Sequence, residues 1–335
     1  MYTVSVVIPA WHEEDTIGGL ISHIQKESKN WAPLFKLKTI YLITHDKATG
    51  EVGKKADQQG NVKHYLVPRH KGGKIASLNK ALSLVKKENP DITIFLDGDI
   101  VLSKNALLYL LKSLVKGTRN SPTSQKQHVI KYGAVTGRPA PLNPKNNLFG
   151  FWAHTLTNAA HKMRLYNARR NLPVNITGNI YAEWTHLLPN KLPLNILDDI
   201  YMSYYIQAQG YPITYSPKSI AKQYFPTTYK QWLTQKLRNL KNEKTTLTIL
   251  LEKQKNGEFK HKPQNMRSFL KEVAHFTYTL ELVKSPKQAM YLILLFLARL
   301  HVWILATLES SPLLNPKAYT SPWRNWVKIK PKTRE

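Results

Sequence analysis

Two acidic side chains separated by a single glycine could carry metal and phosphate chemistry in this 335-residue chain. Asp97 and Asp99 follow the apolar run of residues 91–96, so both carboxylates can project toward one ligand from the end of a buried strand. Carboxylate oxygens are the ligands that Mg²⁺ and Mn²⁺ prefer, and either ion can bridge them to a diphosphate. Taken alone, such a pair is more often an acidic turn, so its assignment depends on the rest of the chain.

A second pair of acids, Asp198 and Asp199, lies at the start of a predicted helix over residues 199–208 that ends at Gly210. Carboxylates at a helix N-terminus are favoured by the exposed amides and by the helix dipole, which is a structural role. Paired acids at a helix start can also perform catalysis. The residues alone leave both roles open.

Basic residues and glycines supply the groups that approach phosphates and sugars. Lys71 and Lys74 flank two glycines at the start of a predicted helix over residues 74–87, where lysine ammonium groups suit a phosphate. A solvated basic turn that caps the helix is an equally good interpretation of this segment alone. Gly178 lets a sugar approach the backbone because it has no side chain, although a strand bulge would also favour glycine.

Alternating strands and helices must position these residues. Apolar and β-branched runs predict strands at residues 4–8, 39–44, 62–67, 91–96, 129–137 and 174–182. Helical spacing predicts helices at residues 16–26, 74–87, 148–170 and 199–208, and turn-forming residues predict a loop at 117–128. This alternation is typical of a mostly parallel sheet with helices on both faces.

The succession of motifs resembles that of the family 2 glycosyltransferases over about residues 3–240. The family opening V-I-P-A-Y-N-E-E, its G-K-x-x-A-L-N motif, its D-x-D, its glycine-containing acceptor loop and its E-D or D-D pair correspond to residues 7–14, 71–79, 97–99, 177–179 and 198–199. The resemblance implies an A-type glycosyltransferase fold, a Rossmann-like mixed sheet flanked by helices. It also implies an inverting transfer from a nucleoside-diphosphate sugar.

The resemblance assigns donor-binding roles to the matching positions. These are Pro9, Ala10 and Glu13 for the nucleotide pocket, Asp46 for the base, Lys74 and Asn79 for the border of the nucleotide, and Asp97 and Arg238 for the diphosphate. Asp97 and Asp99 would hold Mn²⁺ or Mg²⁺, which neutralises the charge that develops on the leaving diphosphate. The planar guanidinium of Arg238 suits phosphate oxygens, although a basic residue on a lysine-rich helix is more often simply solvated.

The acceptor side follows from the same resemblance. Inversion needs a base that removes a proton from the acceptor hydroxyl as it attacks the anomeric carbon, and it needs no protein nucleophile. Asp199 matches the family's general base, Asp198 matches the supporting acid before it, and Gly178 lies in the loop that passes beneath the acceptor.

Three departures from the family pattern leave specificity open. His12 stands where the family usually has Asn, and residues 44–46 (Thr-His-Asp) replace the usual turn at the base-contacting strand end. Asn239 replaces the tryptophan of the Q-x-x-R-W motif found in processive synthases. The base and the capacity for processive addition are therefore not predicted.

We expect a catalytic domain over residues 1–245 and a C-terminal helical region over 246–335 with an apolar helix at 289–308. Twenty apolar residues are long enough to cross a bilayer, but Arg299 near the middle is costly there. A span, an in-plane helix and a helix packed on the core remain alternatives. Residues that suit an anionic membrane interface are Lys284, Lys287, Trp303, Tyr319, Trp323, Trp326 and the basic tail 328–334.

The composition and the N-terminal sequence limit which partners and which cellular location are expected. A formal net charge of +28 favours polyanionic neighbours, and the absence of cysteine excludes disulfides, thiolate nucleophiles and cysteine-ligated metals. The first nine residues lack a signal-peptide pattern, so we expect catalysis at the cytoplasmic face of a membrane. The expected partners are a nucleoside-diphosphate sugar, a glycan or lipid-linked acceptor and an anionic membrane surface, in synthesis of cell-envelope polysaccharide or glycolipid.

Two other functions are compatible with parts of the sequence. A basic nucleic-acid-binding protein would explain the charge, but the sequence has no helix-turn-helix, zinc-finger or RNP-type signature, so no nucleic acid is expected. A nucleotidyltransferase also uses paired acids and magnesium on a Rossmann-like sheet. It would release pyrophosphate rather than a nucleoside diphosphate.

Overall fold

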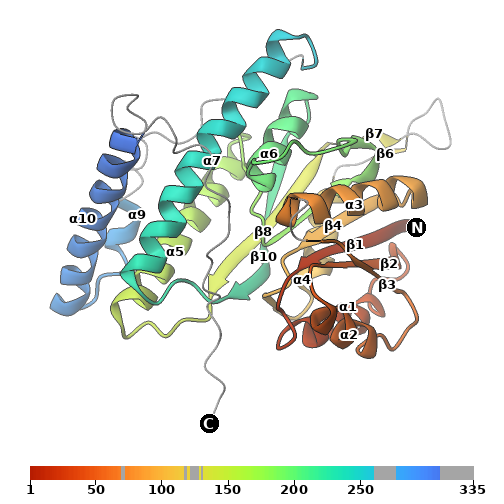
Figure 1. Ribbon diagram of the computed structural model, residues 1–335, viewed down its shortest axis with the longest axis horizontal. Helices are drawn as coiled ribbons and strands as arrows, with labels where there is room; N and C mark the ends of the chain where they lie inside the picture. Colours follow the sequence, from red (N-terminus) through yellow and green to blue (C-terminus); the bar gives the residue numbers. More distant parts are fainter. Residues whose placement is uncertain (69–71, 117–118, 121–127, 130, 260–276, 310–335) are drawn as a thin grey trace. The chain divides into compact units, whose positions relative to one another are not determined.

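The computed structural model of the protein describes all residues except 69–71, 117–118, 121–127, 130, 260–276 and 310–335 (Figure 1). The chain forms two compact units. The first contains Met1–Pro139, Arg164–Lys222 and Thr245–Gln264, and the second contains Ala140–Met163, Gln223–Lys244 and Asn265–Glu335. Each unit is therefore built from three separate stretches of the sequence.

The first unit is built on an eight-stranded sheet with the order β3-β2-β1-β4-β9-β8-β10-β5. Its strands are β1 (Tyr2–Ala10), β2 (Phe35–Thr44), β3 (Val62–Leu66), β4 (Ile92–Leu96), β5 (Val101–Leu102), β8 (Ala134–Pro141), β9 (Ile180–Trp184) and β10 (Ile213–Gln223). The first four pair in parallel, whereas β9 is antiparallel to β4 and β8. A separate two-stranded ladder joins β6 (Arg119–Asn120) and β7 (His128–Val129).

Helices cover both faces of this sheet, as the sequence predicts (Figure 1). They are α1 (Ile17–Ser28), α2 (Lys47–Lys55), α3 (Gly73–Glu88), α4 (Ala106–Val115), α6 (Asp198–Ala208) and the short 3₁₀ helix η2 (Thr185–Leu187). Every residue of β4 and residues 4–10 of β1 are buried, which explains their near-continuous apolar sequences. The predicted mixed α/β architecture of the A-type glycosyltransferases is confirmed.

Two predicted strands begin later than expected. The strand predicted at 129–137 starts at Ala134, and the one predicted at 174–182 starts at Ile180. Residues before β9 have their backbone amides bound by side chains instead of a strand ladder: Ile176 N donates to Ser203 Oγ at 2.8 Å and Thr177 N to Thr136 Oγ1 at 3.0 Å. Their apolar, β-branched composition resembles a strand because this loop is buried.

The second unit is helical. It comprises the first parts of α5 (Leu148–Arg169) and α7 (Tyr229–Lys255), both of which continue into the first unit, together with α9 (Thr277–Leu280) and α10 (Pro286–Glu309). Its core contains Phe151, Trp152, Trp232, Leu292, Leu295, Ala298 and Val302. The predicted apolar helix at 289–308 is therefore confirmed as α10, and by length and composition it could cross a membrane.

Candidate active site

The Asp97-Gly98-Asp99 turn leaves β4 in close contact with the end of β1. A Cβ atom at Gly98 would lie 2.9 Å from Cβ of Ala10 and 3.2 Å from Cγ of Glu13, so only glycine fits without movement. Thr16 Oγ1 donates to the carbonyl of Gly98 at 2.9 Å. This close approach brings the predicted nucleotide-pocket residues Ala10 and Glu13 against the acidic motif.

Lys74 joins the two acidic pairs. Its Nζ lies 2.8 Å from Oδ1 of Asp97 and 2.9 Å from Oδ2 of Asp198, although these three residues are far apart in the sequence. Lys74 is the second residue of α3, after Gly72 and Gly73 with φ of 122° and 56°, a backbone region that favours glycine. The glycine-rich turn therefore places the ammonium group between the two carboxylates.

The charges in this cluster shift one another's proton affinities. Burial opposes the charge on Lys74, but the carboxylates of Asp198 and Asp97 outweigh it and raise the pKa of Lys74 above its usual value. For Asp97, burial raises the pKa to about 6; nearby Asp99 and Asp198 raise it as well, whereas Lys74 opposes the shift. A group of three acids around one lysine has a net negative charge, which suits a divalent cation.

The predicted base lies beside the predicted acceptor glycine. A Cβ atom at Gly178 would lie 3.8 Å from Oδ2 of Asp199 and 3.5 Å from Nζ of Lys74. The neighbouring Asn179 accepts the backbone N–H of Asp97 at 3.2 Å through its carbonyl oxygen. Asp199, Gly178, Lys74 and Asp97 thus meet at one place, although they come from α6, the loop before β9, α3 and the end of β4.

The predicted base-contacting residue, Asp46, also has a structural role. Its carboxylate accepts the backbone N–H groups of Thr49 and His12, each at 2.8 Å, and caps α2. Burial alone would raise its pKa, but these hydrogen bonds outweigh burial and lower it. Pro9 lies on β1 beside Ile43 of β2, so the nucleotide-pocket residues and Asp46 surround the adjoining ends of two parallel strands.

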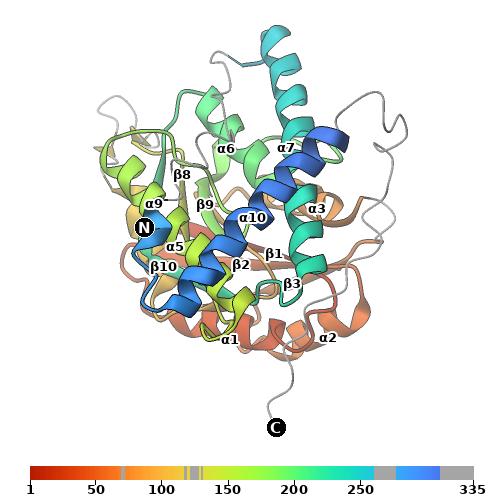
Figure 2. The same ribbon diagram turned by 90° about the vertical axis from the view of Figure 1, so that its left-hand side faces the viewer.

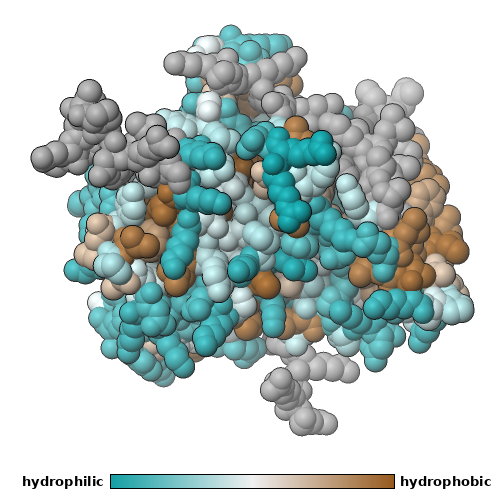
Figure 3. Space-filling view, turned by 180° about the vertical axis from the view of Figure 1, so that it is seen from behind, coloured by the Kyte–Doolittle hydropathy of each residue, from teal (hydrophilic) through white to brown (hydrophobic). Residues whose placement is uncertain are grey.

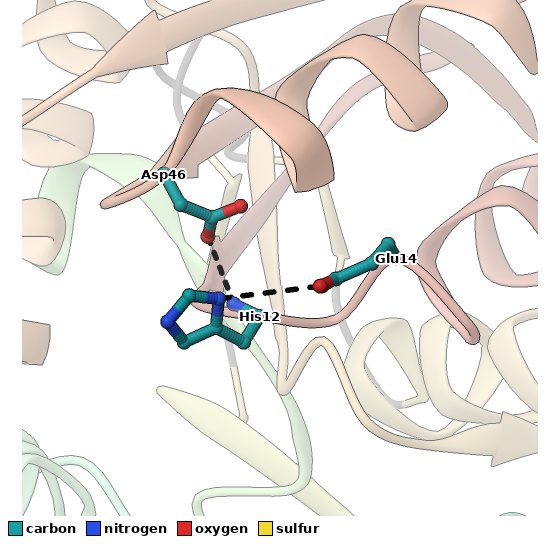
Figure 4. A group of neighbouring side chains, drawn as sticks. All are labelled: His12, Glu14 and Asp46. Atoms are coloured by element: carbon teal, nitrogen blue, oxygen red, sulfur yellow. Dashed lines mark hydrogen bonds and ion pairs between the residues drawn. The ribbon is translucent and has the colours of Figure 1, made fainter.

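His12, Glu14 and Asp46 form a further group of possible metal ligands at this strand end (Figure 4). One ligand atom from each lies within 4.8 Å of the others. The side chains of His12 and Glu14 are 49% and 39% exposed, and His12 Nδ1 is 4.0 Å from Glu14 Oε1. Because Asp46 already accepts two backbone amides, this group is a weaker cation site than the acids near Lys74.

Three further residues were expected near the donor or its phosphates. Asn79 donates from its side-chain N–H to the carbonyl of Leu192 at 3.0 Å, and its side-chain oxygen accepts the backbone N–H of Leu192 at 2.6 Å. Asn79 therefore fixes the loop that leads to Asp198. Arg238 belongs to the second unit, where its guanidinium contacts Asn239 at 3.3 Å, and its role at the diphosphate stays a prediction. Lys71 lies outside the described residues.

Two polar residues were not predicted from the sequence, and one of them, Asn179, lies at the site. Asn179 follows Gly178 directly, so its place in the predicted acceptor loop could have identified it as a site residue. Glu183 is fully buried on β9, its carboxylate oxygens have no hydrogen-bond partner among the described residues, and burial raises its pKa well above the usual value. Its position within the apolar run of β9 gave no sign that this acid is fully buried.

The chain is similar to a known protein family and to several solved structures. The sequence profile described as "Glycosyltransferase like family 2" matches residues 2–242. No curated protein matches the chain.

Similar solved structures include mannosyl-3-phosphoglycerate synthase from Rubrobacter xylanophilus, at 13% identity, TM-score 0.47, and 75% coverage of each chain. Another is glucosyl-3-phosphoglycerate synthase from Mycobacterium tuberculosis in complex with Mn²⁺, UDP-glucose and phosphoglyceric acid, at 16% identity, TM-score 0.46, and coverage of 80% of this chain and 84% of that one. Because the family profile spans most of the sequence, the chain belongs to the family 2 glycosyltransferases.

Proposed function

We propose that this enzyme transfers a sugar, with inversion, from a nucleoside-diphosphate sugar to a hydroxyl group of a glycan or lipid-linked acceptor. The observation that carries the proposal is the meeting of Lys74, Asp97, Asp199 and Gly178 at one place. Sugar transfer needs a positively charged side chain for the phosphates, an acid that can bind a metal ion, a general base, and space for the acceptor. Lys74, Asp97, Asp199 and Gly178 supply these in turn.

Asp97 and Asp99 would hold Mn²⁺ or Mg²⁺, whose positive charge would stabilise the leaving diphosphate. Three observations support the fit: both residues follow β4, Asp99 is exposed, and the surrounding acids carry more negative charge than Lys74 neutralises. Lys74 can also donate to a phosphate oxygen, because its ammonium group has three N–H donors.

Asp199 would remove the proton from the acceptor hydroxyl while the hydroxyl oxygen forms a bond to the anomeric carbon and the bond from that carbon to the diphosphate oxygen breaks. The proton then resides on Asp199, and the products are the glycosylated acceptor and a nucleoside diphosphate. Gly178 would keep the approach to this carboxylate open. Asp198 would position Asp199 through its contact with Lys74.

We further propose that the enzyme acts in cell-envelope polysaccharide or glycolipid synthesis at the cytoplasmic face of a membrane. The apolar helix α10 and the exposed Lys284 and Lys287 that precede or begin it support contact with an anionic membrane. A lipid-linked acceptor would then be presented where the enzyme already lies.

The test is metal-dependent donor binding. Thermal unfolding of the purified chain would be followed with a panel of sugar nucleotides, with and without Mn²⁺, since a ligand that binds the folded state raises the midpoint. We expect a Mn²⁺-dependent shift with one donor that is lost in Asp99→Asn but kept in Glu51→Gln, which removes one exposed acid of α2 as a control. Turnover must release a nucleoside diphosphate; release of pyrophosphate would instead identify a nucleotidyltransferase.

A further inference from the structure

Helix α10 packs on the second unit through one face only. Leu292, Leu295, Ala298 and Val302 of this face are buried against α5 and α7. The indole N–H of Trp152 donates to the carbonyl of Tyr291 in α10 at 2.8 Å, and the rings of Trp152 and Trp232 lie 5.1 Å apart. Figures 1 and 2 both show α10 alongside these two helices. The contact is therefore an ordinary hydrophobic core with a fixed orientation of the helix.

Arg299 lies on this packed face and is only 8% exposed. At about 100° per residue, it projects on the same side as Leu292 and Leu295 rather than away from the unit. It is the only charged residue between positions 288 and 308. Arg299, whose charge would be costly in the hydrocarbon of a membrane, is thus directed toward protein.

The opposite face of α10 is apolar and exposed. Its large side chains are Met290, Ile293, Leu294, Phe296, Leu297, Leu300, Ile304 and Leu308, each 36% to 61% exposed. On a helix these positions form one continuous arc, which Figure 3 shows as hydrophobic surface at the right of the view. The arc also holds His301, whose Nδ1 lies 2.7 Å from the hydroxyl of Tyr229. A continuous patch of this size is typical of an interaction site, unlike single exposed leucines.

Charge favours a lipid surface as the partner. Lys284 and Lys287 are exposed at the start of α10, and the chain has a net charge of +28, which attracts anionic headgroups. An apolar arc that follows two exposed lysines, on a helix whose other face is already packed on protein, suits contact with an anionic lipid surface along its length.

The helices beside α10 argue against a transmembrane position. α7 carries Lys230, Lys236 and Lys241 within the segment that packs in the same unit, and all three remain at least partly exposed. If α10 crossed the bilayer with its core contacts intact, these lysines would be carried toward the hydrocarbon, which is strongly unfavourable. An in-plane position instead buries the exposed arc and leaves α7 in water.

We propose that α10 lies in the plane of an anionic membrane interface, with the arc from Met290 to Leu308 in the lipid and the Arg299 face packed on α5 and α7. This deepens the membrane part of the proposed function and does not depend on the sugar-transfer chemistry. It also selects among the alternatives that the sequence left open, because the helix packs on protein and contacts lipid at the same time.

The first experiment measures sedimentation of the full chain with vesicles of phosphatidylcholine and phosphatidylglycerol. The variant Ile293→Glu/Leu297→Glu places two charges on the arc, and Leu34→Glu/Leu66→Glu is the matched control on leucines of the first unit that are 48% and 47% exposed. We expect vesicle affinity to fall by about tenfold or more in the first variant and to stay unchanged in the control. Equal binding by all proteins, or no binding by the parent, would overturn the proposal.

The second experiment uses the absence of cysteine in the chain, which allows single labelled cysteines. Met290→Cys, Leu297→Cys and Ile304→Cys lie along the arc over about 21 Å of helix. Depth-dependent fluorescence quenching by brominated lipids should give the same shallow depth for all three. A depth that is greatest at position 297 would establish a span, and vesicle-independent dimerisation lost in Ile293→Glu/Leu297→Glu would establish a second copy as the partner; either result overturns the in-plane model of binding.

Mn²⁺-dependent donor binding, measured by thermal shift in the same variants, separates the two proposals. We expect Ile293→Glu/Leu297→Glu to bind donor like the parent. Loss of vesicle binding with donor binding intact supports the role of α10, whereas vesicle binding by a parent that binds no donor would count against the transferase proposal alone.

Discussion

Removing the charge of Lys74 is the most direct perturbation of the cluster. Its ammonium group holds Asp97 at 2.8 Å and Asp198 at 2.9 Å, and the three side chains are 14% to 33% exposed. Exposed ion pairs contribute about 0.2–1 kcal/mol, whereas removing one partner of a buried pair costs about 3–5 kcal/mol. The intermediate exposure places the expected loss for Lys74→Met at about 2 kcal/mol in the free energy of unfolding.

A double-mutant cycle isolates the interaction from the loss of the side chain. The unfolding free energies of Lys74→Met, Asp198→Asn and the double variant would be measured by chemical denaturation without added metal. Because Asp198→Asn removes one of the acids that Lys74 neutralises, we expect a coupling energy of about 1–2 kcal/mol. The control is Lys63→Met, since Lys63 is 53% exposed and 3.5 Å from Glu88, and we expect it to cost less than about 1 kcal/mol. A coupling energy within about 0.3 kcal/mol of zero would refute the reasoning that Lys74 holds the two acidic pairs together.

Three further predictions concern the base, the acidic turn and the buried acid. Asp199→Asn should leave donor binding intact and abolish transfer, and wild-type turnover would refute the base assignment. Gly98→Ala should lower the free energy of unfolding by about 1–3 kcal/mol, because its Cβ would lie 2.9 Å from that of Ala10; an unchanged melting midpoint would show that the turn can move freely. Glu183→Gln should be more stable than the parent above about pH 5, because the raised pKa keeps Glu183 protonated in the folded chain while the unfolded chain releases its proton. The parent therefore loses stability as pH rises, by up to about 1.4 kcal/mol per pH unit, and a difference between the two proteins that is constant from pH 4 to pH 8 would contradict this.

The arrangement of the acids could be predicted from the sequence because it follows from strand ends. Asp97 follows a buried strand, and parallel strands direct their carboxyl ends to one edge of the sheet, where Ala10 also lies. The family motif order then added Asp199 and Gly178. These residues meet because β9 pairs with β4, which connects the acceptor loop to the acidic turn.

The roles of individual polar side chains could not be predicted in the same way. Asn79 fits a donor-binding motif, but its amide is used on the backbone of Leu192, a contact across 113 residues of sequence. Glu183 lies in an apolar strand, and only the three-dimensional structure reveals that it is fully buried. Such roles depend on long-range neighbours, whereas strands and helices depend mainly on local spacing.

The pairing of β4 with β9 also joins two separate stretches of the sequence in one sheet. Residues up to Leu96 build the four parallel strands β1 to β4, and residues from Ala134 to Gln223 build β8, β9 and β10. Besides the β4–β9 ladder, side chains join the two stretches: Lys74 pairs with Asp198, and Asn79 exchanges two hydrogen bonds with the backbone of Leu192. The residues proposed for the donor and for the acceptor are thus held together by side chains that cross between the two stretches. An exchange of residues 1–96 between related chains would therefore have to keep Lys74, Asn79 and the register of Phe95 with Tyr181 for the site to assemble.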